Sequence, residues 1–359
     1  MPRALKVPAA LFVIADVAAA CGDGGTPQRG VGDGAGEQAA DRARCEDVDL
    51  SRAPDRPTTI RFGHGAAAEE QVWLMAAEPE ITEHQGTWYE LEPSAFRGNE
   101  ERFVAYQAGE LDALTVSAPT LVRAVAQRIG VKAVVTVTRE SAEGFRTTFL
   151  ALEDSGISDA GDLSGKKIGI VDIGSATEYW AKSGVAAAGL DPERDVEYVV
   201  LPFPAQGEAL RNGQIDAAVM VEPFYTMAHQ GGGVVDVFDS LDGPGFDQEL
   251  ILFAFDNGFR EENPEVVCAW IEDFQTATDW YEANTDEAKK VLAEGEWVRT
   301  PVEIYTRAGD WLHPDGGVVD VEGLDRLVDS MIEFGVLDED QRVAAEEMVA
   351  VDFAPAEGG

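Results

Sequence analysis

The stretch Gly174-Ser175-Ala176-Thr177 has the residue types that hold small anions in proteins. Gly174 leaves the backbone open to close approach. The hydroxyls of Ser175 and Thr177 stand beside the N–H groups that begin a helix expected over residues 178–188. A small oxyanion could bind there without any basic residue. The other interpretation, which stays open, is that Ser175 or Thr177 only caps its own helix.

Three more loops follow expected strand ends, where open α/β sheets bind their ligands. Ser117 is either a ligand hydroxyl or a helix cap, and His64 is either a donor to ligand or a loop residue without such a role. Glu222 would repel a simple anion but suits an ammonium or ring N–H group; a charge at a helix start is the other interpretation. The candidate ligand-binding residues are Gly63, His64, Gly65, Ser117, Ala118, Gly174, Ser175, Ala176, Thr177 and Glu222.

Two of these loops end a passage that occurs twice, at residues 105–119 and 209–223. Gly, Asp, Ala and Pro recur in register, and the apolar run between Asp and Pro has one length. Each copy predicts a helix that ends at a left-handed glycine, Gly109 or Gly213, then a short strand and a helix opened by Pro. Two such copies indicate two similar α/β lobes with a ligand cleft between them.

The remaining pattern alternates expected strands and helices, which favours parallel sheets covered on both faces. Residues 145–153 and 248–256 are expected to cross between the lobes. Lobe one would then comprise residues 57–147 plus 250–359, where the chain turns helical, and lobe two residues 148–249.

The composition excludes some partners. The 359 residues hold 67 acidic and 27 basic side chains, a net charge of −40. Binding of nucleic acid needs basic patches and is strongly disfavoured. The acid excess favours a salt-adapted protein, because salt screens self-repulsion. An acidic exported protein from an ordinary habitat is the other interpretation.

The N-terminus is typical of an exported protein. Residues 1–21 have a basic start and an apolar stretch that ends in small residues before Cys21, as in a lipoprotein signal; an ordinary secretory signal is the alternative. Residues 22–56 are expected to form a tether, since residues 22–45 are rich in Gly and acid and poor in large apolar residues. Cys45 and Cys268 either pair or leave Cys268 as a buried thiol.

The chain resembles the nitrate/sulfonate/taurine-binding family of substrate-binding proteins of ABC importers, which includes binders of thiamine-precursor pyrimidines. The resemblance covers about residues 58–293. It rests on four segments, Asp162 to Gly169, Gly174-Ser175, Gly213 to Ala217 and Glu222-Pro223. It implies the type II periplasmic-binding fold, with two α/β lobes joined by two crossing strands, C-terminal helices and closure by hinge motion.

The resemblance also implies a function. The expected protein is extracytoplasmic, anchored to the membrane through Cys21 and monomeric, and it delivers a small sulfonate, taurine or nitrate to permease and ATPase subunits. A pyrimidine or other heteroaromatic ligand is the alternative, and a ligand-sensing receptor is a lesser one.

The sequence predicts no enzyme, no cofactor and no metal site. It has no nucleophile elbow, and its four His residues lack metal spacing. A pyrimidine-synthase-like enzyme shares the expected fold but would need clustered cysteines.

Overall fold

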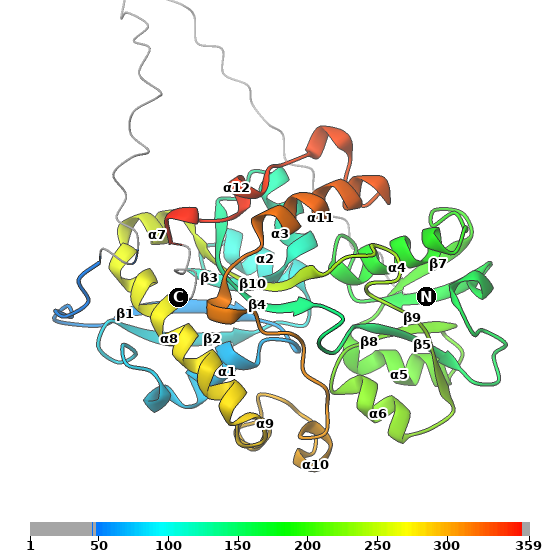
Figure 1. The fold of residues 1–359 in the computed structure, drawn as a ribbon, viewed down its shortest axis with the longest axis horizontal. Helices are drawn as coiled ribbons and strands as arrows, with labels where there is room; N and C mark the ends of the chain where they lie inside the picture. The colour runs from blue at the N-terminus through cyan, green and yellow to red at the C-terminus, as the bar shows by residue number, and fades with distance from the viewer. Residues whose placement is uncertain (1–44, 46–47, 354–359) are drawn as a thin grey trace, which may run out of the picture. The chain divides into compact units, whose positions relative to one another are not determined.

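The computed structural model describes residue 45 and residues 48–353. The expected signal segment, Cys21 and the expected tether up to residue 44 lie outside the described residues. The described chain is built on two five-stranded sheets, which define lobe one and lobe two (Figure 1).

The sheet of lobe one has the strand order β2-β1-β3-β10-β4. Helices α1, α8 and α9 lie on one side of this sheet, and α2, α3 and α11 lie on the other (Figure 1). Its strands are β1 (Thr58–His64), β2 (Tyr89–Ala95), β3 (Ala113–Ser117), β4 (Val131–Glu140) and β10 (Gln248–Asp256). The helices between these strands are α1 (Glu70–Ala77), α2 (Asn99–Gln107) and α3 (Ala118–Ala126).

The sheet of lobe two has the order β7-β6-β8-β5-β9, with α4 on one face and α5 and α6 on the other (Figure 1). Its strands are β5 (Thr148–Leu152), β6 (Lys166–Ile170), β7 (Val196–Val200), β8 (Ala217–Met220) and β9 (Val234–Asp239). Its helices are α4 (Ala176–Ala187), α5 (Phe203–Arg211) and α6 (Phe224–Gln230).

The repeated passage forms the same unit in both lobes. Its strand, β3 or β8, is the middle strand of its sheet. Gly109 and Gly213 end the preceding helices with φ of 75° and 68°, as the sequence predicts. The repeated aspartates also do the same work, since Asp112 accepts the backbone N–H of Arg61 at 2.9 Å and Asp216 accepts that of Lys167 at 2.9 Å. Each aspartate ties the repeat to the strand beside the repeat strand, β1 in lobe one and β6 in lobe two.

The sheets are mixed, which corrects the expectation of parallel sheets. In lobe one β10 runs antiparallel to β3 and β4, and in lobe two β5 runs antiparallel to β8 and β9. Each of these strands enters from the other lobe rather than through a crossover helix, so it need not share the direction of its neighbours. The crossings themselves are residues 141–147 and 240–247, since most of 145–153 and all of 248–256 are sheet strands.

Glu140 joins the two crossing segments where β4 ends. Its buried carboxylate accepts hydrogen bonds from the backbone N–H of Thr147 (2.9 Å), the Ser240 hydroxyl (2.6 Å) and the Trp311 indole (3.3 Å). Burial raises the pKa of this carboxyl. Because its partners come from both crossings, Glu140 fixes one crossing against the other.

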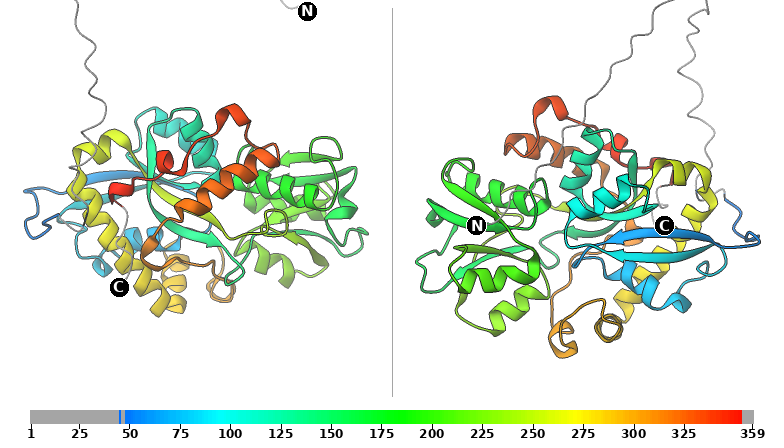
Figure 2. Two further views of the ribbon diagram at one scale, coloured as in Figure 1. Left: turned by 45° about the horizontal axis from the view of Figure 1, so that its top comes forward. Right: turned by 180° about the vertical axis from the view of Figure 1, so that it is seen from behind.

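The chain beyond β10 is helical, as expected, and much of it packs on lobe one. Helix α8 contacts α1, and α11 contacts α3 and β10; Figure 2 shows this last, red part of the chain beside the cyan helices of lobe one. A disulfide joins Cys45 to Cys268 in α8, which decides between the two possibilities left by the sequence. The helices are α7 (Asn257–Glu262), α8 (Pro264–Ala283), α9 (Thr285–Glu294), α10 (Val302–Tyr305), α11 (Val321–Glu333) and α12 (Ala345–Met348).

Among the described helices, none has the length and apolar character needed to cross a bilayer.

Candidate functional site

A small cavity of about 80 Å³ lies between the two lobes. Helix starts and strand ends of both lobes wall it, where the sequence predicts the ligand. Most of its lining is apolar, so polar groups are few. The lining comprises residues 65–69, 97–99, Arg102, Ser117, Val171, Ser175, Ala176, Thr177, Trp180, Phe203, Val221, Leu250, Ile251 and Trp311. A cavity far below the usual few hundred Å³ of drug-sized pockets suits only a compact ligand.

The loop after β1 is closed by a glutamate four residues on. Both carboxylate oxygens of Glu69 accept the N–H of Gly65, at 3.0 and 2.9 Å. A Cβ on Gly65 would lie 2.8 Å from a terminal nitrogen of Arg102 and 2.9 Å from Glu69, so a side chain here would displace these two groups. The charge of Glu69 therefore sits where a bound anion would otherwise meet this loop.

Arg102, near the start of α2, is a buried cation of the cavity wall, and Arg97, which also lines the cavity, is exposed. Arg102 is 5% exposed, lies 3.7 Å from Glu69 and donates to the carbonyl and the hydroxyl of Thr115, the latter at 2.6 Å. Burial lowers the pKa of Arg102. Its Nε is buried and has no hydrogen-bond partner among the described residues. An unpaired buried donor is costly, and a ligand oxygen would satisfy it.

The loop after β6 repeats this arrangement in lobe two. The N–H of Gly174 donates to Glu178 at 2.5 Å, which matches the Gly65–Glu69 pair in spacing and place. Ser175 donates its hydroxyl proton to the carbonyl of Asp172 at 2.7 Å. Thr177 accepts the N–H of Val171 at 2.9 Å.

The hydroxyls of Ser175 and Thr177 have no proton left for an anion in this conformation. They lie 2.8 Å apart, and because Ser175 already donates to Asp172, Thr177 must donate to Ser175. The Ser175 oxygen keeps a lone pair that can accept a ligand donor. What this loop still offers an anion is the backbone at the start of α4, where the first N–H groups have no intrahelical carbonyl.

The structure brings half of the candidate residues into the cavity lining and leaves the other half outside it. Those in the lining are Gly65, Ser117, Ala176 and the hydroxyl pair of Ser175 and Thr177. Those outside the lining are Gly63, His64, Ala118, Gly174 and Glu222. Sequence reasoning missed Arg102, which carries the cavity's buried positive charge. No motif marks it, because its role depends on contacts with Glu69 and Thr115 that are distant in sequence.

His64 is packed into lobe one beside the cavity. Its Nδ1 lies 3.1 Å from the Trp73 indole nitrogen and 3.0 Å from the carbonyl oxygen of Gly65, and its ring lies 5.3 Å from that of Trp297. Nδ1 can accept from the indole when the ring proton is on Nε2, or donate to the carbonyl when Nδ1 carries it. Burial lowers the pKa of His64, which favours the neutral ring.

Glu222 links lobe two to the segment that follows α10. Its carboxylate accepts the N–H of Gly309 at 3.1 Å and both the N–H and the hydroxyl of Thr226, at 3.2 and 2.9 Å. Burial raises the pKa of Glu222. These contacts match the expectation of a charge at a helix start, since Thr226 lies in the first turn of α6.

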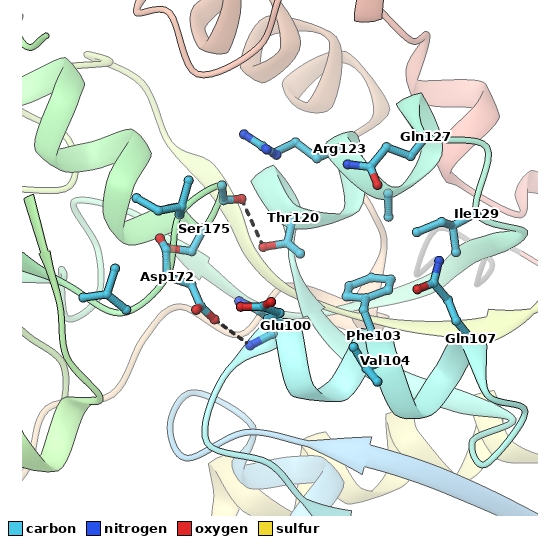
Figure 3. Close-up of a pocket in the computed structure, with 15 residues that line it drawn as sticks. Glu100, Phe103, Val104, Gln107, Thr120, Arg123, Gln127, Ile129, Asp172 and Ser175 are labelled. Atoms are coloured by element: carbon cyan, nitrogen blue, oxygen red, sulfur yellow. Dashed lines mark hydrogen bonds between the residues drawn. The ribbon is translucent and has the colours of Figure 1, made fainter. Parts of the chain in front are cut away.

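An outer groove of about 330 Å³ adjoins the cavity and shares Asn99 and Ser175 with it (Figure 3). Helices α2 and α3 of lobe one and residues 172–175 of lobe two form its walls. The Thr120 hydroxyl donates to the carbonyl of Gly174 across it at 3.4 Å, and Asp172 accepts the N–H of Asn99 (Figure 3).

No group of His, Cys, Asp and Glu side chains in the described part of the chain is arranged to hold a metal ion.

The solved structures similar to this chain include periplasmic binding proteins and an enzyme. The periplasmic aliphatic sulphonate binding protein SsuA of Escherichia coli matches 82% of this chain and 97% of its own, with a TM-score of 0.63 and 17% identity. The match to the desulfurization enzyme DszB covers 82% of this chain and 96% of the DszB chain, with a TM-score of 0.57 and 17% identity. Such identities show the fold alone, so the chain has the periplasmic-binding-protein fold.

The chain belongs to the NMT1-like family, whose model matches residues 53–294. It is also similar to the nitrate/nitrite binding protein NrtA of Synechococcus elongatus, with 28% identity over 153 residues. That match covers 41% of this chain and 34% of NrtA. The chain thus spans about a third of the length of the curated relatives it matches.

Proposed function

We propose that this chain is the solute-binding component of an ABC importer and binds a compact anion between its lobes without chemical change. The observation that carries the proposal is the buried Nε of Arg102, which has no hydrogen-bond partner among the described residues, on a side chain that lines a cavity walled by both lobes. Nitrate and sulphonate are named as the ligands of two similar proteins, NrtA and SsuA, and both are compact oxyanions.

The lining supports binding rather than catalysis. Among the described residues it holds no His, Cys or Lys, and the hydroxyls of Ser175 and Thr177 donate to protein oxygens rather than to a base. A nucleophile needs a neighbouring base to accept its proton. The proposal therefore excludes the chemistry of an enzyme such as DszB at this cavity.

A heteroaromatic ligand is the second candidate, favoured by a different observation. The Ser175 oxygen can accept but not donate, and the lining includes the indoles of Trp180 and Trp311. A flat ring with an N–H donor would use all three groups. A pyrimidine is the matching class.

The proposal extends to location and partners. The protein would lie outside the cytoplasm, anchored through Cys21, and pass its ligand to permease and ATPase subunits. Changing Cys21 to Ser should release it from membranes, as measured by fractionation. Continued membrane attachment of this variant would contradict the anchor. The charge of −40 supports a salt-adapted source.

A thermal-shift screen of the chain in high salt tests the ligand. The panel is taurine, alkanesulfonates, nitrate, bicarbonate and aminopyrimidines. A ligand at a hundred times its Kd stabilises by about 2.7 kcal/mol and raises Tm by a few degrees. A shift with anions supports the first candidate, a shift with aminopyrimidines alone supports the second, and no shift at all contradicts both.

Arg102→Lys sharpens the screen because it keeps the charge beside Glu69 but removes the free Nε–H. We expect this variant to lose most of the anion-induced rise in Tm. Arg123→Lys is the matched control, since Arg123 lines the outer groove and not the cavity. An equal loss in both variants would remove Arg102 from the site.

A further inference from the structure

Helix α2 of lobe one receives its N-terminal cap from lobe two. Its own N-cap residue, Gly98, has no side chain, yet the first N–H groups of a helix need acceptors. Asp172, which follows β6 in lobe two, accepts the N–H of Asn99 at 2.9 Å. A carboxylate at this place is favoured by both hydrogen bonding and the helix dipole.

Gly98 shows how closely the two lobes fit here. A Cβ on Gly98 would lie 2.6 Å from Oδ2 of Asp172. The backbone of Gly98 is extended, with φ of −158° and ψ of 172°, a conformation open to any residue. The space that glycine leaves is therefore filled by the carboxylate of the other lobe, and no backbone requirement explains this glycine.

The neighbouring contacts across the outer groove are weaker. The Thr120 hydroxyl reaches the carbonyl of Gly174 at 3.4 Å, and the Arg123 side chain packs against Gly174. Neither brings a full charge onto unsatisfied backbone groups of the other lobe. The carboxylate of Asp172 is therefore the strongest polar contact that we find between the described groove walls.

We propose that Asp172 is a positioning residue that holds the two lobes together by capping α2 across the groove. When the lobes separate, α2 loses its cap and Asp172 loses the N–H donor of Asn99, so opening costs free energy whether or not a ligand is bound. The proposal goes beyond ligand binding, and its test needs no ligand. A failure of this proposal can therefore be distinguished from a failure of the proposed function.

Spin labels on the two lobes measure the separation directly. The chain with Cys21→Ser, Glu110→Cys and Gln214→Cys carries one label at an exposed, equivalent position of each repeat and keeps the Cys45–Cys268 disulfide. Pulsed electron–electron double resonance then gives the distribution of distances between the two labels in the absence of ligand. With Asp172→Ala we expect a longer-distance population, with the open-to-closed ratio raised about five- to tenfold, as for the loss of a helix cap.

Asp159→Ala is the matched control. Asp159 caps a short helix inside lobe two by accepting the N–H of Gly161, so its loss should leave the interlobe distance unchanged. Circular dichroism and Tm of each variant establish that it is folded. A distance distribution unchanged by Asp172→Ala in a folded protein would overturn the proposal, as would equal opening in both variants.

Gly98→Ala tests the same contact from the other side. Its methyl group meets the carboxylate, so this variant should also populate longer distances. Adding Asp172→Ala to it should cause no further opening, because the methyl then has no carboxylate to meet. Independent, additive opening in the double variant would show that Gly98 and Asp172 do not act through one contact.

Discussion

The two lobes have the same arrangement of strands and loops, but they differ in the ion pair formed by the glutamate that follows the glycine loop. In lobe one Glu69 pairs with Arg102, and both side chains are buried. In lobe two Glu178 pairs with Lys182, which also bonds Glu193, an exposed residue. The same loop thus carries an enclosed ion pair in one lobe and a surface-linked one in the other. Lobe one supplies the buried ion pair of the cavity, and lobe two supplies the hydroxyl pair of Ser175 and Thr177 and the Asp172 cap.

Removing the cation of each ion pair should give the largest difference in stability loss between the two lobes. Arg102→Met leaves Glu69 buried without a cation, and we expect it to lower the free energy of unfolding by about 3–5 kcal/mol. Lys182→Met should cost about 1 kcal/mol, because water near Glu193 can reach its partners. Urea denaturation of both variants measures this. Equal losses would show that the two pairs are equally enclosed.

The residue after the glutamate is Glu70 in lobe one and Tyr179 in lobe two. The pH dependence of stability should differ between these two positions. Burial, with the charge of Asp310, raises the pKa of Glu70 from 4.5 to about 7. As pH rises through this window the unfolded chain releases this proton and the folded chain keeps it. Stability therefore falls, by about 3 kcal/mol for such a shift.

Glu70→Gln should remove this loss of stability between pH 4.5 and 7. The measurement is the free energy of unfolding of both proteins at several pH values. Tyr179, whose hydroxyl bonds Ser330 at 2.7 Å, stays neutral throughout, so Tyr179→Phe should keep the pH dependence of the parent. A parallel pH profile for Glu70→Gln and the parent would contradict the prediction.

The repeated aspartates should differ by a smaller amount. Asp112 binds the side chain as well as the N–H of Arg61, with an Nε distance of 2.8 Å, whereas the Asp216 carboxylate binds the N–H of Lys167 and lies 3.9 Å from Lys166. Asp112→Ala should cost about 2–3 kcal/mol and Asp216→Ala about 1 kcal/mol. Chemical denaturation gives both values, and the reverse order would refute this account.

Replacing the two glycines that end the repeated helices with alanine should cost the same stability in both lobes. Gly109 and Gly213 both have positive φ, and an added Cβ at either would meet no atom within 4 Å. Alanine should therefore cost about 1–2 kcal/mol at each site, through backbone strain alone. Unequal losses of Tm would show that packing also differs there.

Local pattern was enough to predict most of the fold. The repeat placed β3 and β8 correctly, because helix-ending glycines, apolar strands and helix starts are features of a few adjacent residues. The direction of β5 and β10 could not be predicted in this way, because it depends on which lobe each strand enters from. Antiparallel pairing there follows from the crossing, and no local signal marks it.

The candidate site was less predictable because its polar groups are satisfied over long distances. Gly174, Ser175 and Thr177 fit an anion loop by type, but Glu178 and Asp172 already use their polar groups. One signal was present in the sequence, since both loops have a glutamate four residues after the glycine. The meeting of Asp172 with Asn99 joins residues 73 apart, and only the assembled lobes reveal it.

The disulfide between Cys45 and Cys268 has a mechanical consequence. A force pulling on the chain ahead of residue 45 passes through the bridge into α8, which packs against α1 in lobe one. Such a load would therefore enter the molecule through a helix of lobe one rather than through lobe two.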